Sequence, residues 1–270
     1  MRNRKLAVLA ICLAMGCVSA DAQAVLGMDA PGLFEKGMNA LEGSNASRSP
    51  ANAIDYFRRS SDLGFAPAQV VLGYLYEPGH SITTDPREAL ELYKKAARQD
   101  DSLAQWLAGR MIYLGSVPPR DLNEAATWLE KSSGHGNPFA EYLLAKIALE
   151  RNQYARSADL FRQGALQGLP QAQRQLGVLL REGQGVPMDK FEAYVWMLVS
   201  ADGGLRDNLT DLQSLEADLG SMQLERAKSK ARELEGSTTR SAVAHGCTGW
   251  RGEFDAIPAP PPPDLQRFCR

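Results

Sequence analysis

The sequence predicts an all-α protein, a right-handed α/α superhelical solenoid built from stacked helix pairs. Small residues recur at a fixed period through most of the chain, and the apolar residues within each period follow helical spacing. The composition, 44% hydrophobic and 23% charged, is that of a soluble folded chain. A formal net charge of -2 argues against nucleic-acid binding through bulk positive charge.

Two series of small residues define the repeat. The first series is spaced by 36 residues and once by 32, at Gly37, Gly73, Gly109, Ala145 and Gly177. The second stands three residues before a large side chain, at Ala53, Ala89, Ala125, Ser157 and Ala193. Both series agree if four residues are deleted between Ala145 and Ser157. We therefore predict five repeats, at about 31–66, 67–102, 103–138, 139–170 and 171–204.

Each repeat is predicted to be a helix, a turn and a second helix. In the second repeat, residues 68–76 and 89–97 both place apolar side chains at steps of three and four. Pro78 and Gly79 interrupt the pattern, and Asp85-Pro86 is a helix-start signal, a capping residue followed by proline. One such pair cannot bury its apolar face alone, so neighbouring copies must share a core.

The repeat pattern ends at about residue 204. Residues 205–236 predict a capping helix pair, with leucines along one face, a second helix from Ser221 and a stop at Gly236. Residues 237–270 are proline-rich and predict a non-helical tail.

The first 24 residues predict a signal peptide. A basic start precedes the apolar run from Leu6 to Ala20, which is too short to span a bilayer comfortably. Small residues then favour cleavage after Ala24, with Ala20 as the alternative. A lipid anchor on Cys17 is a further alternative, although Ala14 stands where the lipid-attachment motif has leucine.

Signal cleavage leaves two cysteines, Cys247 and Cys269. In an exported chain such a pair predicts one disulfide, which would stabilise the tail by ~3 kcal/mol. Free thiols are the alternative.

The fifth repeat resembles the Sel1-like repeat, a relative of the tetratricopeptide repeat with a longer inter-helix loop. Its residues include Leu176-Gly177, the loop Gly183-Gln-Gly185-Val186-Pro187, and the pair Ala193 and Trp196. The second and third repeats match well. The first has Lys36 at the usual leucine, and the fourth lacks the Gly-x-Gly-Val loop. The resemblance covers residues 31–204 and implies protein–protein contact, including control of signalling receptors and assembly of envelope complexes.

By analogy with tetratricopeptide units, the first helix of each pair lines the concave face. The inward positions lie three before, one after and four after the first small residue. They are Phe34, Met38, Leu41, Val70, Tyr74, Glu77, Trp106, Arg110, Tyr113, Tyr142, Lys146, Leu149, Arg174, Val178 and Arg181.

Aromatic and basic side chains on this face are the residue types that dominate binding energies. The predicted partner-binding residues are Tyr74, Trp106, Arg110, Tyr113, Tyr142, Lys146, Arg174 and Arg181. We expect them to bind an extended or helical protein segment with acidic groups. The alternative is that some of the aromatic rings belong to the core between repeats.

No catalytic, metal or cofactor site is predicted. The three histidines lack a second ligand at metal spacing, and the chain contains no phosphate-binding loop and no Gly-x-Ser-x-Gly motif. Some cysteine-rich Sel1-like proteins have been associated with β-lactam hydrolysis. This chain has no cysteine between residues 18 and 246, which removes the main reason for that comparison.

The expected function is therefore that of a non-enzymatic adaptor or regulator in the bacterial periplasm, with no membrane span after cleavage. Two alternatives remain open, a cell-wall or β-lactam-related hydrolase and a scaffold for polysaccharide export. A secreted or lipid-anchored form is the alternative location.

Overall fold

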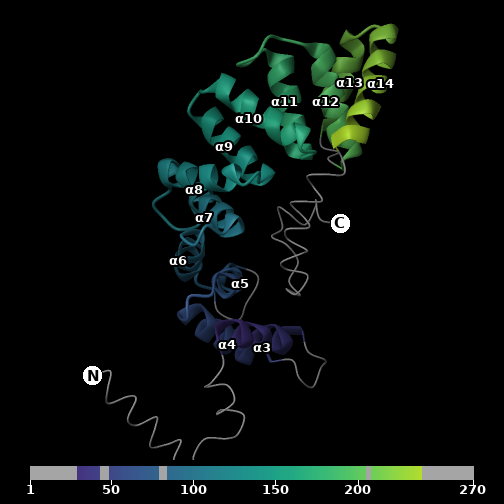
Figure 1. Ribbon diagram of the computed structural model, residues 1–270. Coiled ribbons are helices and arrows are strands. Elements are labelled where there is room, and N and C mark those ends of the chain that lie inside the picture. The colour runs from purple at the N-terminus through teal and green to yellow at the C-terminus, as the bar shows by residue number, and fades with distance from the viewer. Residues whose placement is uncertain (1–28, 43–48, 79–83, 205–207, 239–270) are drawn as a thin grey trace, which may run out of the picture.

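A computed structural model describes residues 29–42, 49–78, 84–204 and 208–238, and these segments are helices joined by turns, without a strand among them (Figure 1). The helices are α3 (Ala30–Glu42), α4 (Pro50–Asp62), α5 (Ala66–Tyr76), α6 (Pro86–Ala97), α7 (Ser102–Leu114), α8 (Leu122–Gly134), α9 (Pro138–Glu150), α10 (Tyr154–Leu166), α11 (Pro170–Glu182), α12 (Lys190–Asp202), α13 (Leu209–Asp218) and α14 (Ser221–Thr238).

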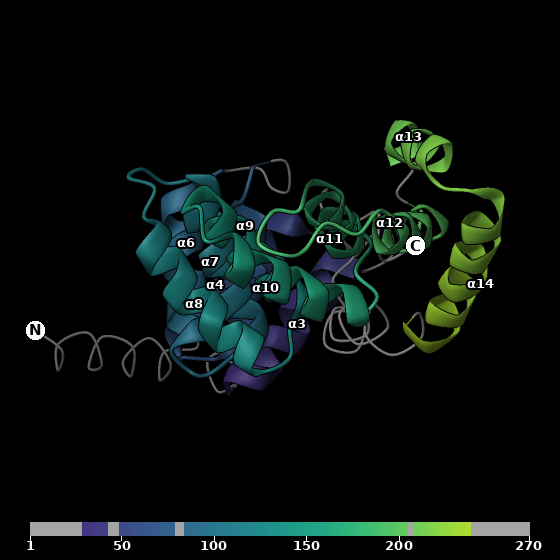
Figure 2. The ribbon, with the colours of Figure 1, turned by 90° about the horizontal axis from the view of Figure 1, so that it is seen from above.

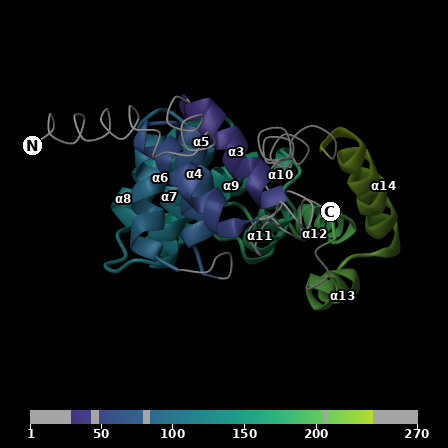
Figure 3. The same ribbon diagram turned by 90° about the horizontal axis from the view of Figure 1, so that it is seen from below.

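The helices stack in chain order as an arc, which confirms the predicted solenoid of helix pairs (Figure 1). Helices α3 to α12 form five antiparallel-packed pairs, and the second helix of each pair also packs on the first helix of the next. At the end of the array, α13 and α14 lie on the far side of α12 from α11 (Figure 2 and Figure 3). Both helices pack on α12.

The helices begin where short polar side chains can accept backbone hydrogen bonds. Asp85, Asp101, Asp121, Asn137 and Asp189 each cap the helix that follows them. Asp85 accepts from the amides of residues 87 and 88, and proline follows it at the first helical position, as the sequence predicts.

Left-handed residues turn the chain from one repeat into the next. Gly64, Gly136, Gly168 and Gly204 have φ values of 89°, 79°, 83° and 98°, and Asp100 takes the same place in the second repeat with φ 67°. Glycine tolerates this backbone region at little cost, and aspartate is among the few other residues that enter it. The five positions are spaced by 36, 36, 32 and 36 residues, in step with the repeat.

The four-residue deletion lies in one loop. Only residues 151–153 connect α9 to α10, whereas 115–121 and 183–189 connect the corresponding helices of the third and fifth repeats. Asn152 makes the short turn with φ 57°. The fourth repeat therefore keeps both helices and loses only the longer loop.

The two helices of a pair meet at the first series of small residues. A Cβ on Gly73 would lie 2.8 Å from Tyr93 Cε1 and 3.2 Å from the Ala89 carbonyl oxygen. A Cβ on Gly109 would lie 2.7 Å from Leu129 Cγ. The paired helices therefore approach each other closely at Gly73 and Ala89. The side chains that fill the glycine gaps are Phe57, Tyr93, Leu129 and Met197, each one residue after the large side chain that follows the second series of small residues.

One apolar core runs along the array. Its two halves, one from α3 to α9 and one from α9 to α14, share Phe139 and Leu160 as neighbours. Each repeat thus buries the apolar face of the next, as expected for a solenoid.

Several predictions concern the two ends of the chain. The signal peptide, Cys247, Cys269 and nearly all of the proline-rich tail lie outside the described residues. Helix α14 continues past the predicted stop at Gly236 and ends at Thr238. Within the described segments, no helix combines the length and apolarity needed to cross a membrane.

We predict that Gly109→Ala lowers the urea midpoint of unfolding, by an amount equivalent to about 1 kcal/mol. Overpacking a tight core costs ~1–3 kcal/mol, and the gain in helix propensity offsets ~1 kcal/mol of that cost. Gly134→Ala is the matched control, because it is also helical but no atom lies within 4 Å of its added Cβ. An equal or higher midpoint for Gly109→Ala would contradict this account of the packing.

Candidate binding surface

The first helix of each pair faces the inner side of the arc. Helices α7 and α9 contact each other directly, as first helices do when a curved array brings its inner elements together. In Figure 1 the arc opens toward one side.

Three of the predicted partner-binding residues lie in the packing between the second and third repeats. Tyr74, Trp106 and Arg110 are only 1%, 2% and 8% exposed. The Arg110 Nη1 lies 3.3 Å from Glu77 Oε2, and its guanidinium lies 5.8 Å from the centre of the Trp106 ring. The Tyr93 hydroxyl donates to Glu77 Oε1 at 2.7 Å. This cluster holds α5, α6 and α7 together.

The environment of this cluster favours neutral tyrosines. Burial, followed by the negative charge of Glu77, raises the pKa of Tyr74. The same two causes raise the pKa of Tyr93. Both hydroxyls therefore stay protonated across the physiological range.

Tyr113, Tyr142 and Lys146 are partly exposed and lie on neighbouring helices, α7 and α9. We call these three residues the tyrosine–lysine patch. The Tyr142 ring packs 5.7 Å from that of Phe161, which fixes its orientation. Burial is the main cause that raises the pKa of Tyr113 to about 12, and a hydrogen bond to Glu150 adds to it.

Glu150 organises the edge of this patch. It accepts a hydrogen bond from Arg120 Nη2 at 2.8 Å and another from Tyr113, and these bonds lower its pKa. Lys146 acts on the same carboxylate electrostatically. The guanidinium of Arg120 also lies 4.9 Å from the centre of the Tyr113 ring. Tyrosine, lysine and carboxylate thus form one continuous polar and aromatic surface across two repeats.

The last two predicted residues are tied to α13. The side chains of Arg174 and Arg181, on α11, are 26% and 28% exposed. Arg181 donates to Asp211 Oδ1, and an Arg174 nitrogen lies 3.9 Å from the other oxygen of the same carboxylate. Arg181 also pairs with Glu182 at 3.1 Å. The two guanidinium groups are therefore held in place by acidic side chains of the chain itself.

The remaining inner positions are apolar. Met38 and Val70 are buried, and Phe34, Leu41, Leu149 and Val178 are partly exposed. Of all fifteen positions, none is fully exposed.

A ladder of buried amides joins each repeat to the one before it. The Nε2 atoms of Gln69, Gln105 and Gln173 donate to carbonyl oxygens eight residues earlier, at 3.4, 3.4 and 3.2 Å. The fourth repeat has Glu141 at the equivalent position, 5% exposed, and it accepts from Gln167 Nε2 at 2.7 Å. Burial raises the pKa of Glu141. A charged carboxylate cannot donate the bond that the three glutamines donate.

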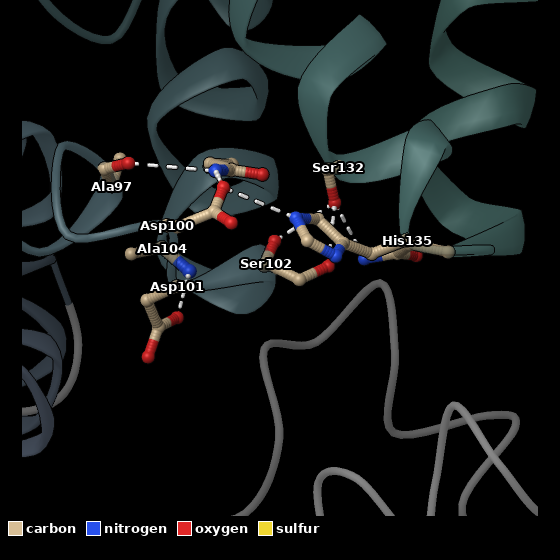
Figure 4. Close-up of polar contacts among 9 residues, drawn as sticks. Ala97, Asp100, Asp101, Ser102, Ala104, Ser132 and His135 are labelled. Atoms are coloured by element: carbon tan, nitrogen blue, oxygen red, sulfur yellow. Dashed lines mark hydrogen bonds and ion pairs between the residues drawn. The ribbon is translucent and has the colours of Figure 1, made fainter.

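Figure 4 shows this ladder at the turn between α6 and α7, beside the end of α8. Asp100 accepts from Gln105 at 2.9 Å and lies 3.2 Å from His135 Nε2. These contacts lower the pKa of Asp100. Ser132 donates to the Ser102 carbonyl at 2.8 Å. The group combines serine, histidine and aspartate, but its bonds serve the junction of two repeats.

Ser60 and Ser200 make the same bond as Ser132, to the first residue of the first helix in their own repeats, at 2.6 and 2.7 Å. The recurrence of this bond in three repeats identifies it as a packing device. Among the described residues, no three His, Cys, Asp or Glu side chains are grouped so that they could hold a metal ion.

The fold and this surface define a helix-pair solenoid of the repeat class. The profile described as Sel1 repeat matches residues 20–65, 66–101, 102–137 and 170–205, which together make up more than half of the chain. The chain belongs to the Sel1 repeat family. The unmatched fourth repeat is the one that lacks the long loop.

Two curated relatives were found at moderate identity. An uncharacterized protein of Neisseria meningitidis, NMB1327, is 28% identical over 188 residues, which cover 67% of this chain and 38% of that protein. Chitin synthase regulatory factor 3 of Schizosaccharomyces pombe is 26% identical over 161 residues, covering 58% of this chain and 14% of that protein. The chain therefore spans well under half the length of these relatives.

Solved structures share the fold. The protective antigen c5321 of uropathogenic Escherichia coli, which displays an SLR fold, gives a TM-score of 0.65 at 24% identity, over 86% of this chain and 50% of that one. A Sel1 repeat protein from Oxalobacter formigenes gives 0.61 at 23% identity, over 82% and 88%.

We predict that Glu141→Gln raises the free energy of unfolding at pH 7 by about 1 kcal/mol, the net worth of one buried hydrogen bond. Burial raises the folded-state pKa of Glu141 above its unfolded value. The stability that this group contributes is thus fully present at low pH and is lost as pH rises through the folded-state pKa. Urea unfolding at pH 7 and pH 4 should therefore show a smaller difference between variant and parent at pH 4.

The reciprocal variant, Gln173→Glu, is the control. It places a carboxylate at the equivalent position of the fifth repeat, so it should destabilise the protein more at pH 7 than at pH 4. If each variant changes the free energy of unfolding equally at pH 7 and pH 4, a buried charge at this position is not the cause.

Proposed function

We propose that this protein is a non-enzymatic adaptor or regulator that binds a protein segment along the inner side of α7, α9 and α11. The observation that supports this best is the tyrosine–lysine patch, where partly exposed aromatic and basic side chains lie on adjacent inner helices. Tyrosine supplies a large rigid contact area with a polar tip, which suits protein recognition.

The eight residues predicted from the sequence take different parts in this proposal. Tyr113, Tyr142 and Lys146 make the direct contacts, and Lys146 pairs with an acidic group of the segment. Tyr74, Trp106 and Arg110 act from the interior, since they hold the inner helices that present the patch. Arg174 and Arg181 border it, with their charges shared by Asp211.

The family supports a role in contact between proteins, since Sel1 repeat proteins typically mediate such contacts and are generally non-catalytic scaffolds. The similarity to a chitin synthase regulatory factor is consistent with a regulatory role. We further propose that residues 1–24 direct export to the periplasm. There the protein would serve an envelope signalling or assembly complex, and Cys247 and Cys269 would form a disulfide.

A photo-crosslinking amino acid at Tyr142 should capture an envelope protein in intact cells. The same group at Trp128, partly exposed on α8, a second helix of its pair, should not capture that protein. The captured protein, identified by mass spectrometry, should present an acidic segment. Capture at both positions alike would show that the inner face is not the site.

Lys146→Glu should weaken the binding of that purified protein about tenfold while leaving the helical circular dichroism unchanged, because it reverses one charge in a partly desolvated contact. Lys95→Glu, which makes the same charge change at an exposed position of α6, is the matched control. Equal binding by parent and Lys146→Glu, or capture of glycan in place of protein, would reject the proposed acidic protein segment.

A further inference from the structure

A cleft of about 610 Å³ lies between α12 and α13, away from the tyrosine–lysine patch. Its wall consists of Tyr194, Leu198, Ala201, Asp202, Gly204, Leu209, Leu212, Gln213 and Glu216. We call it the α12–α13 cleft. Its size falls within the range of pockets that enclose small ligands or side chains of a partner.

The wall of the α12–α13 cleft combines apolar and acidic groups. Leu198, Leu209 and Leu212 supply the apolar part, and Leu209 is 53% exposed despite its size. Asp202 and Glu216 supply two carboxylates, and no basic side chain is among the described residues that form the wall. A ligand that fits must therefore carry an apolar stem and a positive charge.

The negative charge in this region is concentrated. Burial is the main cause that raises the pKa of Tyr194, and the charges of Glu216, Glu225 and Asp202 all add to it. The Tyr194 hydroxyl donates to Glu216 at 2.8 Å. Three carboxylates from α12, α13 and α14 thus act on one hydroxyl.

Glu235 gives a second sign of concentrated negative charge near Asp202. Burial and the nearby Asp202 raise the pKa of Glu235, on α14, to about 7, although Arg232 opposes the shift. The Glu235 Oε1 atom is buried without a hydrogen-bond partner among the described residues. Asp202 and Glu235 therefore lie close together, and their mutual repulsion outweighs the effect of Arg232.

Three basic side chains of the surrounding helices are paired with other acidic groups. Lys190 binds Asp218 at 2.8 Å, Lys230 binds Glu192, and Arg181 binds Asp211. These pairs, together with the bond from Asn208 Nδ2 to the Met197 carbonyl at 2.7 Å, hold α13 at its present distance from α12. Among the described residues, the wall of the cleft therefore contains two carboxylates and no cation.

We propose that the α12–α13 cleft receives an arginine side chain from a segment of a partner protein. The methylene stem would pack on Leu198 and Leu209, and the guanidinium would lie between Asp202 and Glu216. Arginine fits better than lysine because its planar group can donate to two carboxylates at once and is less strongly hydrated. The site is separate from the tyrosine–lysine patch and opposite to it in charge.

The test uses the whole chain labelled with ¹⁵N and ¹³C-methyl leucine, and two acetylated, amidated peptides. One is Gly-Ser-Leu-Arg-Leu-Ser-Gly, and the other replaces arginine by citrulline, which has the same shape without the charge. We expect the arginine peptide to shift the methyl signals of Leu198, Leu209 and Leu212 in a saturable manner. The citrulline peptide should bind at least about tenfold more weakly, since it lacks the charge-assisted bonds.

Single substitutions test which carboxylates bind the arginine. Asp202→Asn and Glu216→Gln should each weaken binding of the arginine peptide about tenfold. Glu233→Gln, which removes an exposed acidic group of α14 outside the cleft, should leave it unchanged. Amide spectra report whether each variant folds, and Glu216→Gln can still accept the hydrogen bond of Tyr194.

Equal binding of the two peptides, absence of shifts at millimolar peptide, or shifts located on other helices would each overturn the proposal. An equal loss in Glu233→Gln would also do so, because it would indicate a general effect of net charge. Lys146→Glu should leave the titration unchanged, so the outcome is independent of the function proposed for the tyrosine–lysine patch.

Discussion

The structure depends on one contact repeated along the chain, a small residue of the first helix lying against a large side chain of the second. At Gly73 and Gly109 the space for a Cβ is taken by Tyr93 and Leu129, so that the paired helices approach to the limit that their backbones allow. This close approach fixes the geometry inside each repeat. Since every repeat has nearly the same geometry, the pairs stack with a regular rotation, and an arc with an inner face results.

Polar contacts then fix how one repeat sits on the next. Buried glutamines of the first helices donate to carbonyls at the end of the preceding repeat. Buried serines of the second helices donate to the carbonyl of the first residue of the first helix in the same repeat. Such groups cost free energy when they lack partners, so they favour one arrangement over nearby alternatives. Apolar packing therefore stabilises the stack of repeats, and the hydrogen bonds of the amide ladder fix the position of each repeat on the one before it. Glu141 is the exception, since it places a charge where the ladder has an amide.

Most of the fold could be predicted from the sequence because a repeat displays the same local rule several times. The period, the left-handed turns and the loop that carries the deletion all follow from spacings that recur, and a single copy would not have been convincing. The inner face could be predicted from the same register. The exposure of each residue on it could not, because exposure depends on the side chain that the next repeat brings. Trp106 is covered in part by Phe139, and Arg110 finds Glu77 in the repeat before it.

The contacts made by the capping helices could not be predicted from the sequence either. A sequence pattern places Arg174 and Arg181 on the inner face, but the acid that holds them, Asp211, comes from a helix outside the repeats. The spacing from Arg181 to Asp211 is thirty residues, the same as that between Arg120 and Glu150. Ion pairs about one repeat apart are therefore the signal that could have found these contacts, although the spacing alone does not separate a pair from two solvated charges.

The terminal helix pair changes the chemistry of the end of the solenoid. A solenoid needs a cap because its last repeat would otherwise expose an apolar face, and α13 and α14 cover that face with Leu212, Leu215, Ala227 and Ala231. The same cap pairs the two arginines of α11 with Asp211 and brings Glu216 to the cleft beside Asp202. The basic character of the inner face therefore ends at α11, and an acidic region begins at α12. A partner that contacted both regions would need acidic and basic groups in a fixed order along its length. The cap would then set the direction in which such a partner binds.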